Sequence, residues 1–329
     1  MSAAELVARL AGQRLLVVGD LVLDEYQIGR VSRLSREAPV PVLEQTRAEF
    51  LPGGACNPAA NIHSLGSAAL LVGLLGQDEA AARLTTELQR RGLDIPGLLV
   101  DPARPTTHKI RIVAEGSYVF AHHLARVDRL SQAAPAEAVE QALCDRIAAL
   151  APGCAAVLIS DYCGGVITPA VIAAARAAAR SQHALAIVDS QGDLGRFTGF
   201  DLIRCNRQEA ERYLGRALEE DAAFAQALAQ LLARLDAGGA VITRGAEGLS
   251  LMTRGGEAQH LASANRSQVF DVTGAGDTLI AVIALALAAG LDLRAAAGLG
   301  NAAAGVAVRR LGNVAVTPPQ LLAALLVDW

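Results

Sequence analysis

The chain has 329 residues, of which 52% are hydrophobic, and 29 basic against 33 acidic side chains give a formal net charge of −4. The apolar content excludes a disordered protein, and the slight acidity argues against a nucleic-acid binder, which needs a basic face. The longest apolar run, 279–291, is shorter than the roughly 20 residues of a membrane helix. Five cysteines lack C-x-x-C spacing, which favours free thiols. We therefore expect a cytoplasmic protein that acts on a small molecule, without nucleic-acid or membrane partners.

The first part of the chain carries two kinds of β pattern. Residues 14–20 are a short apolar run ending in Gly-Asp, which predicts a buried strand. Residues 40–50 and 107–122 mix polar and β-branched residues, with a Glu-Gly-Ser turn at 115–117, and this pattern predicts half-exposed antiparallel strands.

From about residue 134 onward, helical and apolar segments alternate. The helical stretches are 134–150, 168–182 and 220–236, and the apolar runs are 155–160, 184–189, 201–205 and 240–243. This alternation is typical of a parallel sheet covered by helices. We expect one α/β domain over residues 1–329, with β segments near 22–50 and 105–125 forming a lid.

A glycine-rich segment at 52–61 precedes a predicted helix. Gly53 and Gly54 let the backbone approach a ligand closely, and Asn57 offers a donor and an acceptor to sugar hydroxyls. A plain strand-to-helix turn with Asn57 as its cap is the alternative.

A second glycine-rich segment, 271–277, opens an apolar helix. Gly274 and Gly276 allow a tight turn whose unpaired N–H groups would face one anion, with Asp277 in the first helical turn. A carboxylate beside a phosphate makes chemical sense if it takes a proton from an attacking hydroxyl. In the alternative, Thr273 caps the helix and Asp277 only complements its dipole.

Together, these two segments resemble the signatures of the ribokinase/PfkB family of ATP-dependent carbohydrate kinases. The resemblance implies a ribokinase-like three-layer α/β sandwich with a mostly parallel central sheet, and ATP and Mg²⁺ as cofactors. It makes Asp277 the general base and the backbone N–H groups of Gly274, Ala275 and Gly276 an anion hole. A catalytically silent binding protein of this fold would lack the base or the glycines, and all are present.

The resemblance also implies roles for other residues. Asp20 or Asp24 would bind sugar hydroxyls together with Gly53, Gly54 and Asn57, although Asp20 could instead cap a turn. Asn206 and Glu209 would hold Mg²⁺ through water, although their spacing also fits a capping box. The nucleotide-binding residues would be Thr243, Arg244, Gly245, Gly248 and Asn301.

Three further segments resemble the D-glycero-D-manno-heptose 7-phosphate kinases of this family: 35–42, 107–111 and the Asp161-Tyr162 pair. Those enzymes phosphorylate the anomeric hydroxyl to give the 1,7-bisphosphate for ADP-heptose biosynthesis. The resemblance adds Lys109, Arg111 and Asp161 as substrate-binding residues. The chain shows no His-x-Gly-His nucleotidyltransferase motif, so we expect a stand-alone kinase.

Two positions depart from the heptose-kinase pattern. Gly164 and Gln191 stand where those enzymes usually have lysine, and Lys109 is the only lysine of this chain. Either arginines such as Arg36, Arg111 or Arg126 supply the charge, or the acceptor is another sugar, sugar phosphate or nucleoside. We also expect a homodimer, because pairing of the lid strands would cover their exposed edges.

Overall fold

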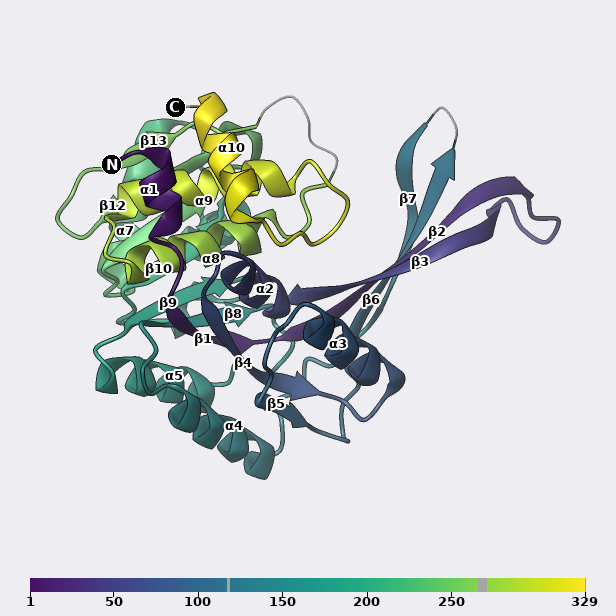
Figure 1. The fold of residues 1–329 in the computed structure, drawn as a ribbon, viewed down its shortest axis with the longest axis horizontal. Coiled ribbons are helices and arrows are strands. Elements are labelled where there is room, and N and C mark those ends of the chain that lie inside the picture. The colour runs from purple at the N-terminus through teal and green to yellow at the C-terminus, as the bar shows by residue number, and fades with distance from the viewer. Residues whose placement is uncertain (117–118, 266–270, 329) are drawn as a thin grey trace.

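The computed structural model describes residues 1–116, 119–265 and 271–328, which form a large sheet, a small sheet and the helices around them (Figure 1). The strands of the large sheet are β1 (Arg14–Gly19), β4 (Ala68–Leu75), β5 (Gly97–Val100), β8 (Ala156–Asp161), β9 (Leu185–Ser190), β10 (Leu202–Asn206), β11 (Gly239–Thr243), β12 (Leu249–Thr253) and β13 (Gln259–Leu261). Their order across the sheet is β13-β12-β11-β10-β9-β8-β1-β4-β5. Neighbouring strands pair in parallel, except that β12 pairs antiparallel with both β11 and β13. The predicted mostly parallel sheet is confirmed.

Helices cover both faces of this sheet. They are α1 (Ala3–Ala8), α2 (Cys56–Ser64), α3 (Glu79–Arg90), α4 (Glu137–Leu150), α5 (Pro169–Ser181), α6 (Arg207–Leu214), α7 (Asp221–Arg234), α8 (Ala275–Ala288), α9 (Leu293–Ala307) and α10 (Pro318–Asp328). Because side chains alternate along a strand, β1 sends Leu15 and Val17 into the core under α2 and α8, and Leu16 and Val18 into the core under α4 and α5. Burial on both faces explains the continuous apolar runs of these strands.

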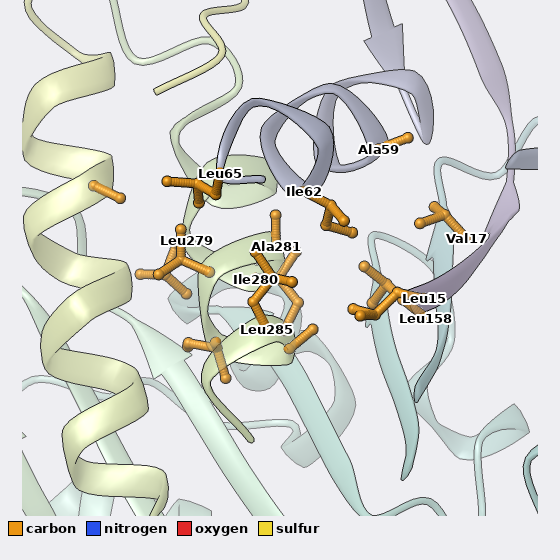
Figure 2. Close-up of a cluster of buried hydrophobic side chains, with 14 of the residues drawn as sticks. Leu15, Val17, Ala59, Ile62, Leu65, Leu158, Leu279, Ile280, Ala281 and Leu285 are labelled. Atoms are coloured by element: carbon orange, nitrogen blue, oxygen red, sulfur yellow. The ribbon is translucent and has the colours of Figure 1, made fainter. Parts of the chain in front are cut away.

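The apolar run at 279–291 forms most of α8, which is a core helix. Figure 2 shows Leu279 of α8 beside Leu65 at the end of α2, and Ile62 of α2 between α8 and the strand residues Leu15 and Leu158. Every residue of α8 from position 277 to position 286 is buried, which explains a helix that is apolar all round. No helix in the described part of the chain has the length and apolarity to cross a membrane.

The strand order reverses direction between β1 and β8. From β1 the chain continues to β4 and β5 on one side, and it returns to β8 on the other side. Connections that diverge in this way leave a gap at the carboxyl ends of the two strands, where α/β proteins bind their ligands. Asp20 directly follows β1 and Asp161 ends β8, so two of the predicted site residues lie at this position.

The small sheet extends away from the main body (Figure 1). It contains β2 (Leu21–Leu34), β3 (Pro41–Gly54), β6 (Thr107–Gly116) and β7 (Val119–Arg129) in the order β3-β2-β6-β7. The predicted antiparallel pairing holds for β2 with β3 and for β6 with β7, but β2 and β6 pair in parallel. The reason is that both strands follow parallel strands of the large sheet and leave it in the same direction. Ser117 of the predicted turn lies outside the described residues.

Candidate active site

The predicted glycine-rich turn opens α8. Gly274 precedes the helix in a left-handed conformation with φ of 74°, and a Cβ there would lie 2.5 Å from side-chain atoms of Asn57 and Asn313. Among the described residues, no side chain caps this helix, because Thr273 donates its hydroxyl to Asp271. The alternative in which Thr273 caps α8 is therefore wrong. The Ala275 N–H donates to the carbonyl oxygen of Val272 at 3.3 Å, which is longer than a typical N–H···O bond. A helix start of this kind suits an anion, which can take the place of such a weak contact.

Asp277 lies in this turn with only 3% of its surface exposed. The Tyr162 hydroxyl donates to Oδ1 at 2.6 Å, and Asn57 Nδ2 donates to Oδ2 at 3.1 Å. Burial raises the pKa of Asp277 to about 6, and the negative charge of Asp189 adds to the rise, against the two hydrogen bonds and the charge of Arg204. A carboxyl group that titrates close to neutral pH and is held by two donors has the properties of a general base.

Asn57 joins the two glycine-rich segments. Its helix α2 begins at Cys56 and has no side-chain cap within the described chain, so the alternative in which Asn57 caps the helix is wrong. Asn57 Nδ2 lies 3.1 Å from Asp277 Oδ2 and 3.3 Å from the carbonyl oxygen of Gly274, while its Oδ1 accepts from Asn61. The structure thus places this amide against the carboxylate of Asp277, and its predicted contact with a sugar stays a prediction.

Asp24 on β2 connects the small sheet to this centre. Its carboxylate is buried, accepts from Arg111 on β6, and accepts from Asn313 Nδ2 at 2.6 Å. A Cβ at Gly53 would lie 2.2 Å from Asp24 Oδ2, which explains the glycine there. Asn313 Oδ1 lies 3.4 Å from Asn57 Nδ2, so polar contacts continue from the small sheet to the Asp277 carboxylate.

Asp20 has a different role. Its carboxylate accepts hydrogen bonds from the backbone N–H groups of Tyr162 at 2.7 Å, Gly164 at 3.0 Å and Val166 at 3.4 Å. These contacts favour the alternative in which Asp20 caps a turn. A Cβ at Gly164 would lie 2.6 Å from Asp20 Oδ1, so a lysine at this position would require the hydrogen-bonded Asp20 carboxylate to shift. Gly54, with φ of 55°, packs against the Asp20 carbonyl oxygen on the other side.

Asp161 also orders the loop after β8. Its Oδ2 accepts from the hydroxyl of Ser190 at 2.7 Å, and its Oδ1 accepts from the N–H of Cys163 at 3.0 Å. These bonds tie the end of β8 to the end of β9 and fix the loop that carries Tyr162. The predicted contact of Asp161 with substrate stays a prediction.

Arg204 is a buried cation beside the glycine-rich turn. Its Nη1 bonds both carboxylate oxygens of Asp189, at 2.8 and 3.1 Å, and its Nη2 donates to the hydroxyl of Thr243 at 2.9 Å. A Cβ at Gly276 would lie 2.7 Å from Nη2, so the guanidinium packs directly against the turn. This position suits a group that stabilises negative charge bound at the turn.

The three arginines that the sequence suggested as substitutes for the absent lysines lie away from this turn. Arg111 is paired with Asp24 inside the small sheet, whereas Arg36 and Arg126 are exposed. Lys109 on β6 places its Nζ 5.3 Å from the centre of the Tyr162 ring.

Asn206 and Glu209 form the capping box that was the alternative to a metal site. The Asn206 side chain accepts from the Glu209 N–H, and Glu209 Oε2 accepts from the Asn206 N–H. Glu209 Oε1 accepts from Asn206 Nδ2 at 2.6 Å, and burial raises the pKa of this carboxyl group. Within the described residues, no three His, Cys, Asp or Glu side chains cluster as metal ligands. The capping box is thus confirmed, and the predicted role of this pair in holding Mg²⁺ through water stays a prediction.

The predicted nucleotide-binding residues line a surface beyond β11. Thr243 ends that strand, and Arg244 pairs with Asp221 and lies over the ring of Phe224. Arg244 also lines a cavity of about 550 Å³, and Asn301 lines a neighbouring one of about 690 Å³ that shares the segment 260–262 with it. Gly245 and Gly248 flank the turn between β11 and β12. Cavities of this size suit a nucleoside.

Sequence reasoning did not single out Tyr162, Arg204 or Asn313 as site residues. One feature of the sequence could have identified Arg204: it is a charged residue within an otherwise apolar strand, directly before Cys205 and Asn206. Tyr162 appeared only as part of a resemblance, and nothing near Asn313 in the sequence marks it.

A buried carboxylate beside an uncapped helix turn, near the switch in strand order, is an arrangement that suits phosphoryl transfer. The model of the pfkB family carbohydrate kinases matches residues 13–319, and the chain belongs to this family. This confirms the family predicted from the sequence.

The relatives and solved structures agree with this assignment. The chain is 41% identical over 322 residues to the bifunctional protein HldE of Nitrobacter hamburgensis, and 40% identical over 311 residues to that of Geobacter metallireducens. These alignments cover 95% and 94% of this chain but 65% and 62% of the relatives, which is less than two thirds.

Two solved structures show the fold. Ribokinase of Arabidopsis thaliana, complexed with ribose and ATP, superposes with a TM-score of 0.74 at 21% identity, covering 95% of this chain and 98% of that one. Phosphofructokinase-2 of Escherichia coli, in complex with potassium, gives 0.78 at 18% identity, covering 96% and 98%. The predicted ribokinase-like fold is confirmed.

Proposed function

We propose that this chain transfers the γ-phosphoryl group of ATP to the anomeric hydroxyl of D-glycero-D-manno-heptose 7-phosphate. The observation that carries this proposal is the buried Asp277 carboxylate, with a pKa of about 6, in the first turn of an uncapped helix. Asp277 accepts the proton of the acceptor hydroxyl. The hydroxyl oxygen then bonds to the γ-phosphorus as the bond to the ADP oxygen breaks.

The turn at the start of α8 holds the transferred group. The N–H groups of Gly274, Ala275 and Gly276 donate to its equatorial oxygens, and Arg204 adds a fixed positive charge behind them. Bound with ATP, Mg²⁺ would supply further neutralisation of the phosphate charge. Glu209 would hold it through water, because both oxygens of that carboxylate already accept from Asn206.

The small sheet acts as a lid in this proposal. Asp24 and Arg111 belong to its strands, and Asn313 and Asn57 connect Asp24 to the base. Closure over the sugar would exclude water, which favours transfer to the acceptor over hydrolysis of ATP.

The choice of a heptose 7-phosphate depends on the resemblance at 35–42, 107–111 and 161–162. A panel of acceptors tests it: ADP release is measured with heptose 7-phosphate, the unphosphorylated heptose, fructose 6-phosphate, ribose and adenosine. We expect kcat/KM to be highest for heptose 7-phosphate by at least about tenfold. The three unphosphorylated acceptors lose the charged contact to the distal phosphate, and fructose 6-phosphate holds its phosphate on a chain one carbon shorter. A higher value for any other acceptor would overturn this choice, and ADP release that none of the acceptors accelerates would overturn the kinase proposal.

We further propose that two copies pair through their small sheets. Large apolar side chains are exposed on or beside these strands, among them Leu34 at 66% and Val127 at 49%. Contact between two copies would cover this surface and the strand edges. We expect sedimentation to show a dimer that Leu34→Glu with Val127→Glu converts to monomer, while Leu326→Glu on α10 leaves it intact. A monomeric wild-type protein would contradict the pairing.

A further inference from the structure

Tyr162 is held at both ends of its side chain. Its hydroxyl donates to Asp277 Oδ1 at 2.6 Å, and the ammonium of Lys109 lies 5.3 Å from the centre of its ring. Its backbone is fixed as well, since its N–H donates to Asp20 at 2.7 Å. A rigid aromatic side chain with these contacts connects a cation on β6 of the small sheet to the carboxylate in α8.

The hydroxyl end acts on the ionisation of Asp277. Burial and the nearby Asp277 charge raise the pKa of Tyr162, so the phenol stays protonated and can only donate to the carboxylate. A donated hydrogen bond favours the ionised form of Asp277. A carboxylate oxygen has two lone pairs, so Oδ1 can accept an acceptor hydroxyl as well as the phenol.

The other groups around Asp277 come from three elements. Asn57 on α2 donates to Oδ2, Asp189 on β9 opposes ionisation, and Arg204 on β10 favours it. Because Asp189 and Arg204 are bonded to each other, their opposing effects partly cancel. Tyr162 and Asn57 are therefore the direct donors that keep this buried carboxyl group ionised.

The ring end acts on Lys109. An ammonium over an aromatic face is attracted by the electrons of the ring and loses side-chain freedom. Lys109 pairs in register with Asp24 on one side and Asp128 on the other. It is the only lysine of the chain, and a side chain at Gly164 would require the Asp20 carboxylate to shift.

We propose that Tyr162 is a positioning residue that couples recognition of an anionic acceptor to the base: its ring presents Lys109 to the phosphate of a sugar phosphate, and its hydroxyl keeps Asp277 ready to accept a proton. This inference rests on the proposed kinase function. The hydroxyl end of Tyr162 affects the pH profile of kcat, and the ring end affects the KM for the acceptor.

Tyr162→Phe tests the hydroxyl end, because it retains the ring. Loss of the donor raises the pKa of Asp277, so we expect the acid limb of the kcat profile to move to higher pH, with the KM for the acceptor changed by less than about twofold. Tyr213→Phe on α6 is the matched control and should leave the profile in place. An unchanged profile for Tyr162→Phe would overturn this half of the inference.

Tyr162→Leu and Lys109→Met test the ring end. Each should raise the KM for a sugar phosphate roughly tenfold, and the double variant should be no worse than either single variant, because both remove the same contact. Additive losses would overturn the coupling. Thermal melting checks that Tyr162→Leu is folded, and if it is not, Lys109→Met decides: an unchanged KM would overturn the presentation of Lys109.

Failure of the inference and failure of the proposed function look different. If the wild-type enzyme releases ADP with a sugar phosphate but the Tyr162 variants behave like wild type, only the coupling is wrong. If the wild-type enzyme phosphorylates no sugar, the proposed function is wrong, and calorimetry with a sugar phosphate then tests Lys109 on its own. Equal affinity of wild type and Lys109→Met would overturn its role.

Discussion

Asp277→Asn is expected to lower kcat by about 10²-fold or more while ATP binding persists. The amide has nearly the shape of the carboxylate, and Asn57 and Tyr162 can still hold it, but it cannot take a proton from the acceptor. The fold should survive, because the substitution removes a buried charge without creating a cavity. The measurements are steady-state ADP release and calorimetric titration with ATP.

Asp145→Asn on the surface of α4 is the matched control, and its kcat should equal that of the wild-type enzyme. If Asp277→Asn retained turnover close to wild type, another group would have to take the proton, and the assignment of the base would be wrong. A loss of ATP affinity as large as the loss of kcat would mean that Asp277 binds the nucleotide and does not act in the chemical step.

Arg204→Met should lower the free energy of unfolding by about 3 to 5 kcal/mol. The side chains of Arg204 and Asp189 are only 11% and 8% exposed, so the substitution leaves Asp189 as an uncompensated buried charge. Arg254→Met provides the comparison, because its partner Asp236 and the arginine itself are largely exposed. That surface pair should contribute about 1 kcal/mol or less. Denaturant unfolding measures both.

A double variant separates stability from catalysis at this position. Asp189→Leu with Arg204→Met replaces the ion pair with apolar side chains, which should restore most of the lost stability. Arg204→Met should also lower kcat, and the double variant should keep this loss, because neither variant has a cation behind the turn at Gly276. Recovery of both properties would show that Arg204 serves only the fold.

Local sequence patterns were sufficient for the main framework. The alternation of apolar runs and alanine-rich helices predicted the parallel sheet, and the second glycine-rich segment predicted the tight turn that opens α8. They succeeded because each depends on neighbours in the sequence: strand burial, helix period, and the conformation that Gly274 must adopt. The same reasoning identified the Asn206 and Glu209 capping box.

The rest of the site depends on contacts that no local pattern encodes. Asn57 donates a hydrogen bond to Gly274, which lies 217 positions later in the sequence, and Asn313 donates one to Asp24, which lies 289 positions earlier. Asp20 illustrates the limit: an aspartate after a strand could bind a sugar or cap a turn, and only the fold brings the loop at 162–166 to its carboxylate. The parallel pairing of β2 with β6 likewise follows from where each strand leaves the large sheet.

The most direct test is a crystal structure with heptose 7-phosphate and a non-hydrolysable ATP analogue. We expect the anomeric oxygen within about 3 Å of an Asp277 oxygen, with the γ-phosphoryl group held by the turn at 274–277. We also expect Lys109 to lie against the 7-phosphate. A complex in which a different hydroxyl faces Asp277, or in which the γ-phosphoryl group lies away from that turn, would contradict these expectations.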